Sequence, residues 1–163
     1  MRITRIPLIC PLVSCEFVRF VADLRLSPKF CMRPFVVPGF SMSPFIHDGD
    51  VITLASALTR VRFGDVVAFM NPHNGKLTVH RIVGMARVAY RVKGDNSPEE
   101  DGVIARRCIL GRVTHVERAG RNGRLGLGIE RVVIAFLSRR GWLFPVIIPI
   151  WRIVRPLAKR FVT

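Results

Sequence analysis

Short apolar runs separated by turn-forming residues fill the middle of this chain of 163 residues and constrain its fold more than any other feature. The runs cover residues 51–54, 65–69, 78–83, 89–92 and 109–116, and Gly, Pro, Asn and Asp gather between them at 48–50, 71–75 and 94–98. Runs of this length bounded by such residues are typical of strands joined by tight turns. The sequence therefore predicts a mainly β domain, to which we assign residues 36–118.

The segments on either side of this domain differ from it in charge. The net charge of +15 divides into +4 for residues 1–38, +3 for 39–118 and +8 for 119–163, from 6, 11 and 9 Lys/Arg against 2, 8 and 1 Asp/Glu. We therefore separate an apolar and basic N-terminal segment, 1–35, from a basic and apolar C-terminal segment, 119–163. Helical periodicity predicts short flanking helices at 16–26 and 128–137.

The C-terminal segment contains two apolar runs, 132–138 and 142–151, which are divided by Arg139 and Arg140. A helix that spans a bilayer needs about 20 apolar residues, so neither run is long enough alone. Apolar residues with Trp and Arg at their edges are typical of an interfacial segment that binds anionic lipid. A C-terminal helix packed on the β domain is the alternative, and both stay open.

The cysteines and histidines indicate no metal site. The four cysteines, Cys10, Cys15, Cys31 and Cys108, are too few and too irregularly spaced to predict a disulfide framework. No spacing of Cys and His residues resembles that of a metal-binding motif.

Three segments of the predicted β domain contain the parts of an acyl-transfer site. The first is Gly39-Phe40-Ser41-Met42-Ser43-Pro44, and the second is Val79-His80-Arg81-Ile82-Val83. The third is Lys93-Gly94-Asp95-Asn96, with Asp101 a little further on. A serine hydroxyl is a poor nucleophile at neutral pH, so such a site needs a general base beside it and an acid that orients the base. Ser41 and His80 suit the first two roles. Asp101 suits the third, and Asp95 is a second carboxylate that could lie near the site.

The residues around Ser41 suit a turn that offers backbone N–H groups to an oxyanion. Gly39 permits a positive φ and leaves space where a substrate strand would approach. Pro44 restricts the backbone where the chain leaves the turn. We therefore predict that Gly39, Met42 and Pro44 shape the turn and the oxyanion site.

Each of these residues also has a purely structural interpretation. Ser41 could be a turn serine bonded to its own backbone, and His80 could be a strand histidine whose ring is satisfied locally beside Arg81. Asp101 ends the acidic run 99–101, which would ordinarily be a solvated loop, so Asp95 could orient His80 in its place.

Four segments, in order, resemble the successive motifs of the type I signal peptidases. They are GFSMSPFIHDGD at 39–50, FGDVVAF at 63–69, VHRIV at 79–83 and YRVKGDNSPEED at 90–101. The Val-His-Arg segment resembles the branch found in archaea, the endoplasmic reticulum and some spore-forming bacteria, in which a histidine replaces the lysine base of other members and of the related self-cleaving SOS-type repressors.

This resemblance implies a signal-peptidase-like β-barrel or sandwich core with short flanking helices. It implies Ser41 as nucleophile, His80 as general base and Asp101 as the acid, with Asp95 a second family carboxylate. It further implies an extended polypeptide substrate that pairs with a sheet edge and has small side chains before the cut, no cofactor, and association with a membrane, which we take as the plasma membrane of a prokaryote.

The residues before the nucleophile differ from the usual family pattern. Members of the family usually have Ser-Gly-Ser-Met, whereas Gly39 and Phe40 precede Ser41 here, as in the Gly-x-Ser-Met order of the self-cleaving repressors. No side-chain hydroxyl is therefore expected to donate to the oxyanion, so backbone N–H groups alone would have to stabilise it.

Two functional hypotheses follow from these observations. The first is a membrane-associated serine endopeptidase that cleaves exported or membrane-tethered polypeptides. The second is a non-catalytic protein on the same β scaffold that binds membrane lipid or a polyanion through its basic flanks. Few aromatic residues alternate with basic ones in the central domain, so we expect no specific nucleic-acid partner.

Overall fold

The computed structural model describes residues 34–56, 60–72, 74–123, 126–143 and 149. Its elements are β1 (Phe35–Val36), β2 (Val51–Ser56), β3 (Val66–Met70), β4 (Leu77–Met85), β5 (Ala89–Lys93), β6 (Gly102–Ala105), the 3-10 turn η1 (Arg106–Cys108), β7 (Ile109–Arg118), β8 (Arg121–Gly123) and α2 (Arg131–Arg139). The helix expected at 16–26 lies outside the described residues.

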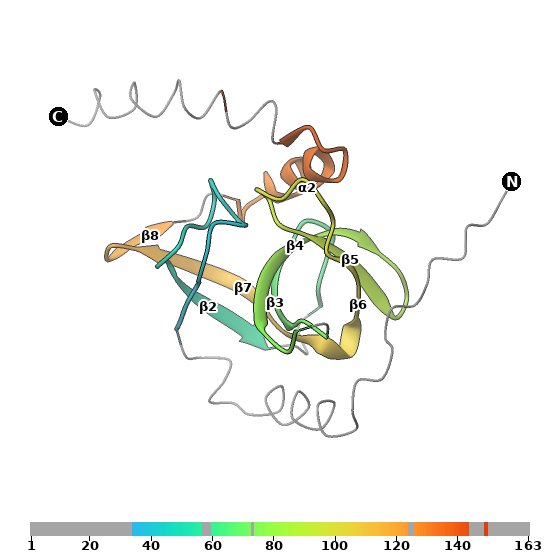
Figure 1. The fold of residues 1–163 in the computed structure, drawn as a ribbon. Helices are drawn as coiled ribbons and strands as arrows, with labels where there is room; N and C mark the ends of the chain where they lie inside the picture. Colours follow the sequence, from blue (N-terminus) through green and yellow to red (C-terminus); the bar gives the residue numbers. More distant parts are fainter. Residues whose placement is uncertain (1–33, 57–59, 73, 124–125, 144–148, 150–163) are drawn as a thin grey trace, which may run out of the picture.

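The strands form one antiparallel sheet that curls around itself (Figure 1). Its order is β1-β2-β7-β3-β4-β5-β6, and β8 pairs with β7 beyond this path. The long strand β7 pairs with β2 over one part of its length and with β3 over another, so it joins the two halves of the sheet. The prediction of a mainly β fold is therefore confirmed.

The curl encloses apolar side chains on both faces of the central strands. Successive residues of a strand point to opposite faces, and in β3 this sends Val66 and Ala68 into one buried cluster and Val67 and Phe69 into the other. A strand buried on both faces needs a continuous apolar run rather than an alternating one. This requirement explains why the sequence of β3 is VVAFM.

All five apolar runs of the sequence form strands, with ends that differ by a few residues. The structure adds three strands that the sequence did not predict, namely β1, β6 and β8. All three are short, and β8 consists of Arg121, Asn122 and Gly123, which form no apolar pattern. The hairpin with β7 explains why β8 is extended, because its three residues pair with Val116–Arg118.

The helix α2 begins three residues later than the 128–137 expected from the sequence. The carboxylate of Glu130 accepts hydrogen bonds from the backbone N–H groups of Gly126 and Gly128, each at 2.9 Å, and so holds the chain in a turn before the helix begins. One side of α2 is buried, through Ile134, Ala135 and Ser138, and the helix packs near β4.

The described part of the expected C-terminal segment is thus joined to the sheet through β8 and α2. The rest of that segment, which is 124–125, 144–148 and 150–163, and residues 1–33 at the other end lie outside the described part of the chain. Over the residues that the structure describes, we find no helix with the length and apolar character needed to cross a membrane.

Candidate active site

Ser41 lies in the turn that follows β1. The N–H of Ser43 donates to the carbonyl of Phe40 at 3.1 Å, and the N–H groups of Phe45 and Ile46 both donate to the carbonyl of Met42. The side chains of Met42 and Ile46 are buried in the core, whereas Ser41 is exposed. The turn is thus anchored by its apolar side chains and leaves the hydroxyl of Ser41 open to solvent.

His80 faces this hydroxyl from strand β4. Its Nε2 lies 3.0 Å from the Oγ of Ser41, which is hydrogen-bond distance. The ring is buried and packs at a tilt against Phe69 of the neighbouring strand, with 6.1 Å between the ring centroids. Pairing of Val67 with His80 fixes this position, because β3 and β4 are both anchored in the core.

Asp101 completes the arrangement from the residue before β6. Its Oδ2 lies 2.6 Å from the Nδ1 of His80, and neither atom has a hydrogen-bond partner elsewhere in the described chain. The N–H of Asp101 donates to the carbonyl of Val92 at 3.1 Å, which fixes the backbone at this point. The structure therefore brings together Ser41, His80 and Asp101, although their catalytic roles stay a prediction.

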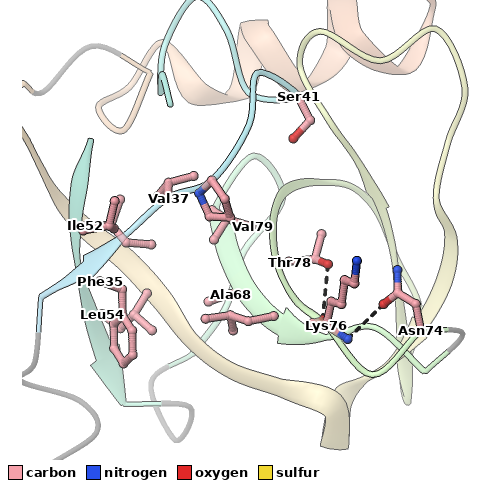
Figure 2. A pocket seen from close by; sticks show the side chains of 13 residues that line it. Phe35, Val37, Ser41, Ile52, Leu54, Ala68, Asn74, Lys76, Thr78 and Val79 are labelled. Carbon is pink, nitrogen blue, oxygen red and sulfur yellow. Dashed lines mark hydrogen bonds between the residues drawn. The ribbon is translucent and has the colours of Figure 1, made fainter. Parts of the chain in front are cut away.

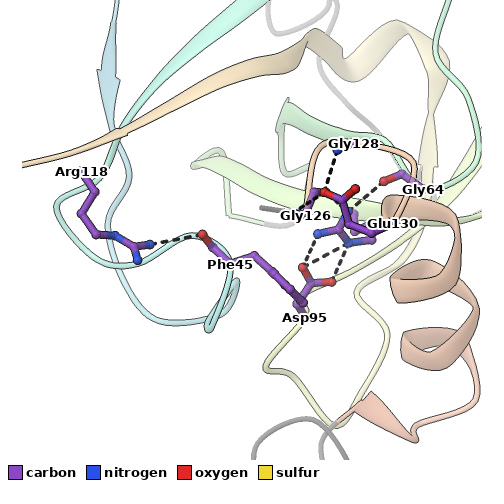
Figure 3. A network of polar contacts seen from close by, with 8 residues as sticks. Phe45, Gly64, Asp95, Arg118, Gly126, Gly128 and Glu130 are labelled. Carbon is purple, nitrogen blue, oxygen red and sulfur yellow. Dashed lines mark hydrogen bonds and ion pairs between the residues drawn. The ribbon is translucent and has the colours of Figure 1, made fainter. Parts of the chain in front are cut away.

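Asp95 does not contact His80, which excludes the alternative that it orients the imidazole. Both of its carboxylate oxygens accept hydrogen bonds from Arg81, with Nε at 2.8 Å from Oδ1 and Nη2 at 2.6 Å from Oδ2. Nη1 of the same guanidinium donates to the carbonyls of Gly64 at 2.9 Å and Gly126 at 2.8 Å (Figure 3). Because both side chains are fully buried, this pair is a fixed part of the scaffold directly beside the site.

The turn that carries Asp95 also holds the serine turn in place. The N–H of Asn96 donates to the carbonyl of Ser41 at 2.7 Å, and its side-chain amide donates to the carbonyl of Phe40 at 3.2 Å. Gly94 lies against the pair itself, since a Cβ there would be 2.8 Å from the carbonyl oxygen of Ser41 and 3.2 Å from the Nε2 of His80. The sequence did not predict that Gly94 and Asn96 hold the serine turn in place, and the only indication was that both lie in the motif at 90–101.

The three residues expected to shape the serine turn have different positions. Gly39 has a φ of +87° with open space around its α-carbon, so it is required for its backbone conformation, and its N–H donates to Asp48 at 2.6 Å. Met42 points into the core, and Pro44 is buried after a cis peptide bond. Within the described chain, the N–H groups of Ser41 and Met42 donate no hydrogen bond; Ser41 is exposed, whereas Met42 is buried.

An apolar cavity of about 160 Å³ opens next to Ser41 (Figure 2). Its walls come from residues 35–38 on one side and 76–79 on the other, with Ile52, Leu54 and Ala68 at its base. On one side, β1 is the last strand in the order of the described sheet, and on the other side, β4 pairs with β5 only from Arg81 onward. The cavity therefore lies beside residues 77–80 of β4, whose edge away from β3 pairs with no strand in the described part of the chain.

One of the comparisons with known proteins identifies a family. A family model described as "Signal peptidase, peptidase S26" matches residues 16–96, a range that includes Ser41 and His80 but ends before Asp101. The search of curated proteins finds no match. Across the described residues, no group of three or more His, Cys, Asp or Glu side chains could hold a metal ion. With the serine turn, the histidine strand and the Gly94–Asn96 turn all inside the matched range, the chain belongs to the signal peptidase family.

Proposed function

We propose that this protein is a membrane-associated serine endopeptidase that cleaves exported or membrane-tethered polypeptides. Membership of the signal peptidase family implies a serine peptidase. The single observation that supports the mechanism is the continuous series of short contacts from Ser41 Oγ to His80 Nε2 at 3.0 Å and from His80 Nδ1 to Asp101 Oδ2 at 2.6 Å. This series provides a nucleophile, a base and an orienting acid in the order that acyl transfer requires.

In the proposed reaction, the Oγ of Ser41 attacks the scissile carbonyl carbon while Nε2 of His80 takes the hydroxyl proton. The tetrahedral intermediate collapses, the C–N bond breaks, and the imidazolium gives its proton to the leaving amine. Water then attacks the acyl-enzyme, with His80 again taking a proton and returning it to Ser41. The carboxylate of Asp101 favours the tautomer with the proton on Nδ1 and stabilises the imidazolium.

The oxyanion of the intermediate would be bound by backbone groups. The residues before Ser41 are Gly39 and Phe40, so no side-chain hydroxyl is available two positions earlier. The N–H groups of Ser41 and Met42 have no acceptor within the described chain and belong to an anchored turn. Preorganised N–H donors of this kind are an effective way to stabilise developing negative charge.

The substrate would bind as an extended chain along the edge of β4 at residues 77–80, which no described strand covers. Pairing with a strand edge satisfies the substrate backbone, and alternate substrate side chains then point to the same side, toward the apolar cavity. An engineered cavity of about 150 Å³ holds one benzene molecule. Two substrate side chains that share the cavity beside Ser41, about 160 Å³, must therefore both be small.

Substitution of the nucleophile tests this proposal. Ser41→Ala should abolish peptide cleavage and labelling by a serine-directed acylating probe, and His80→Ala should suppress both. Ser43→Ala is the matched control, because it removes a hydroxyl from the same turn without touching the proposed site, and it should leave both readouts intact. Cleavage by purified Ser41→Ala protein would exclude Ser41 from the mechanism, and an unlabelled Ser41 in the folded wild type would favour the non-catalytic alternative.

A further inference from the structure

The helix α2 has apolar side chains on two opposite sides. One side, with Ile134 and Ala135, is buried against the domain. The other side is exposed, and Val132, Val133 and Phe136 have 48%, 60% and 48% of their surfaces accessible to solvent. A surface helix of a globular protein ordinarily has charged and polar residues on its outer side, so this exposed apolar side indicates a partner.

The exposed apolar side extends beyond both ends of the helix. Ile129, which precedes it, is 93% exposed, and Trp142, which follows it, is 53% exposed. Residues 132, 133 and 136 have the spacing of one helical stripe, and Ile129 lies in the turn that leads into the helix. We call the surface formed by Ile129, Val132, Val133, Phe136, Arg140 and Trp142 the α2 surface.

The α2 surface is cationic at its edge. Arg139 and Arg140 are exposed, and the guanidinium of Arg140 lies 4.6 Å from the ring centroid of Phe136 and 5.7 Å from that of Trp142. The one acid of residues 119–163, Glu130, already accepts hydrogen bonds from the N–H groups of Gly126 and Gly128. The surface therefore combines exposed aromatic and aliphatic side chains with positive charge that no carboxylate of this segment neutralises.

We propose that the α2 surface binds the headgroup and upper acyl region of an anionic lipid bilayer. The aliphatic and aromatic side chains would enter the interface, while Arg139 and Arg140 would bind lipid phosphates. Charge favours a membrane over a second copy of this chain, because a symmetric dimer through this surface would bring the arginines of both copies together. This inference rests on the proposed function and specifies the partner of the same enzyme.

The buried side of α2, opposite the α2 surface, is joined to the turn that holds Ser41. The buried amine of Lys93 donates to the carbonyl of Ser138 at 3.0 Å and to that of Pro98 at 3.2 Å, so it joins the C-terminal end of α2 to the turn that holds Ser41. Phe40, beside the nucleophile, is itself exposed. Lipid binding at the α2 surface would thus hold a helix that is joined directly to this turn.

The fluorescence of Trp142 reports lipid binding at this surface. The chain has two tryptophans, and in a full-length Trp151→Phe variant Trp142 is the sole emitter. Titration with vesicles of phosphatidylcholine and phosphatidylglycerol should shift its emission to shorter wavelength, and brominated acyl chains should quench it. Vesicles of phosphatidylcholine alone should bind at least about tenfold more weakly, because the basic residues contribute electrostatic attraction.

A matched pair of double variants separates the α2 surface from the basic flanks. Val133→Ser with Phe136→Ser, made in the Trp151→Phe chain, should weaken partitioning into anionic vesicles about tenfold, because two apolar side chains no longer enter the interface. Met85→Ser with Val88→Ser is the control. It removes two exposed apolar residues from the β4–β5 turn and should leave partitioning unchanged. Both variants should cleave a soluble peptide as well as wild type without lipid, so loss of binding and loss of catalysis are distinguishable.

Three results would overturn the proposal. The first is unchanged partitioning of the α2 variant, which would assign lipid binding to the flanks. The second is a Trp142 emission that ignores anionic vesicles. The third is a blue shift that depends on protein concentration without lipid, together with a dimer in sedimentation, which would assign the α2 surface to a second copy of the chain.

Discussion

Gly94→Ala is the substitution that tests the geometry of the site most directly. The φ of Gly94 lies outside the left-handed region, so alanine meets no backbone strain there, and the effect comes from space alone. The new methyl group would be 2.8 Å from the carbonyl oxygen of Ser41 and 3.2 Å from both the Cβ of Ser41 and the Nε2 of His80. Each of these atoms belongs to the proposed catalytic pair.

The size of the displacement follows from these distances. The Ser41 oxygen must move about 0.6 Å to bring its contact from 2.8 Å to an ordinary 3.4 Å. The same oxygen accepts the 2.7 Å hydrogen bond from Asn96, so the movement strains the clamp on the serine turn. A shift of this size can take the Ser41–His80 contact from 3.0 Å beyond hydrogen-bond distance. Misplacement of reacting groups by about 1 Å can cost 10²-fold, so we expect kcat to fall roughly 10- to 100-fold.

The assay compares peptide cleavage and probe labelling with thermal unfolding. Overpacking should lower the free energy of unfolding by about 1–3 kcal/mol, which leaves folded protein to assay at low temperature. Gly123→Ala is the control, because its added Cβ lies 3.5 Å from the nearest carbonyl oxygen, an ordinary contact, and its activity should be unchanged. A folded Gly94→Ala protein with wild-type kcat would refute the argument that close packing at Gly94 sets the Ser41–His80 distance.

Two further substitutions test charged groups. Asp101→Asn should lower kcat on the order of 10²- to 10³-fold, because an amide no longer selects the His80 tautomer with a proton on Nδ1. Glu99→Gln, in the same acidic run, is the control and should have no effect on kcat. Equal activity of the two variants would exclude a role for Asp101 in catalysis. Asp50→Asn should destabilise the fold by about 1–2 kcal/mol at pH 7 in thermal unfolding, because it breaks the ion pair with Arg118. Burial acts to raise the pKa of Asp50, but hydrogen bonds from Arg118 and the His47 N–H outweigh burial and hold this pKa below 3.8. The difference in stability between wild type and Asp50→Asn should therefore be full above pH 4 and vanish as the pH falls further. A constant difference down to pH 2 would contradict this prediction.

Local patterns in the sequence were enough to predict the main strands, because apolar runs such as VVAFM must be buried wherever they occur. They were not enough to predict β1, β6 and β8. Strand β1 has only two residues, and β8 is extended because its partner β7 continues through the hairpin. These strands are extended because they pair with β2 and β7, and not because of an apolar pattern of their own.

The choice between the two carboxylates shows the same limit at the site. Asp101 belongs to an acidic run that resembles a solvated loop, and Asp95 lies in a more distinctive motif, so sequence reasoning could leave both open. The structure separates them through Arg81, whose guanidinium binds Asp95 and leaves Asp101 for His80. This selection depends on burial of Arg81 beneath segments that are remote in sequence. The close contact of Gly94 with Ser41 was likewise invisible, because it exists only after residues 53 positions apart are brought together.

The hydrogen-bond partners of Arg81 are synthesised at different times, because they lie both before and after it in the sequence. Its guanidinium needs Asp95 and the carbonyls of Gly64 and Gly126, and a buried cation without these partners would cost several kcal/mol. A nascent chain of 101 residues already contains Ser41, His80 and Asp101, but it lacks the carbonyl of Gly126 that accepts a hydrogen bond from Arg81. The set of hydrogen-bond acceptors around Arg81, next to His80 in strand β4, is therefore complete only after residue 126 has been synthesised.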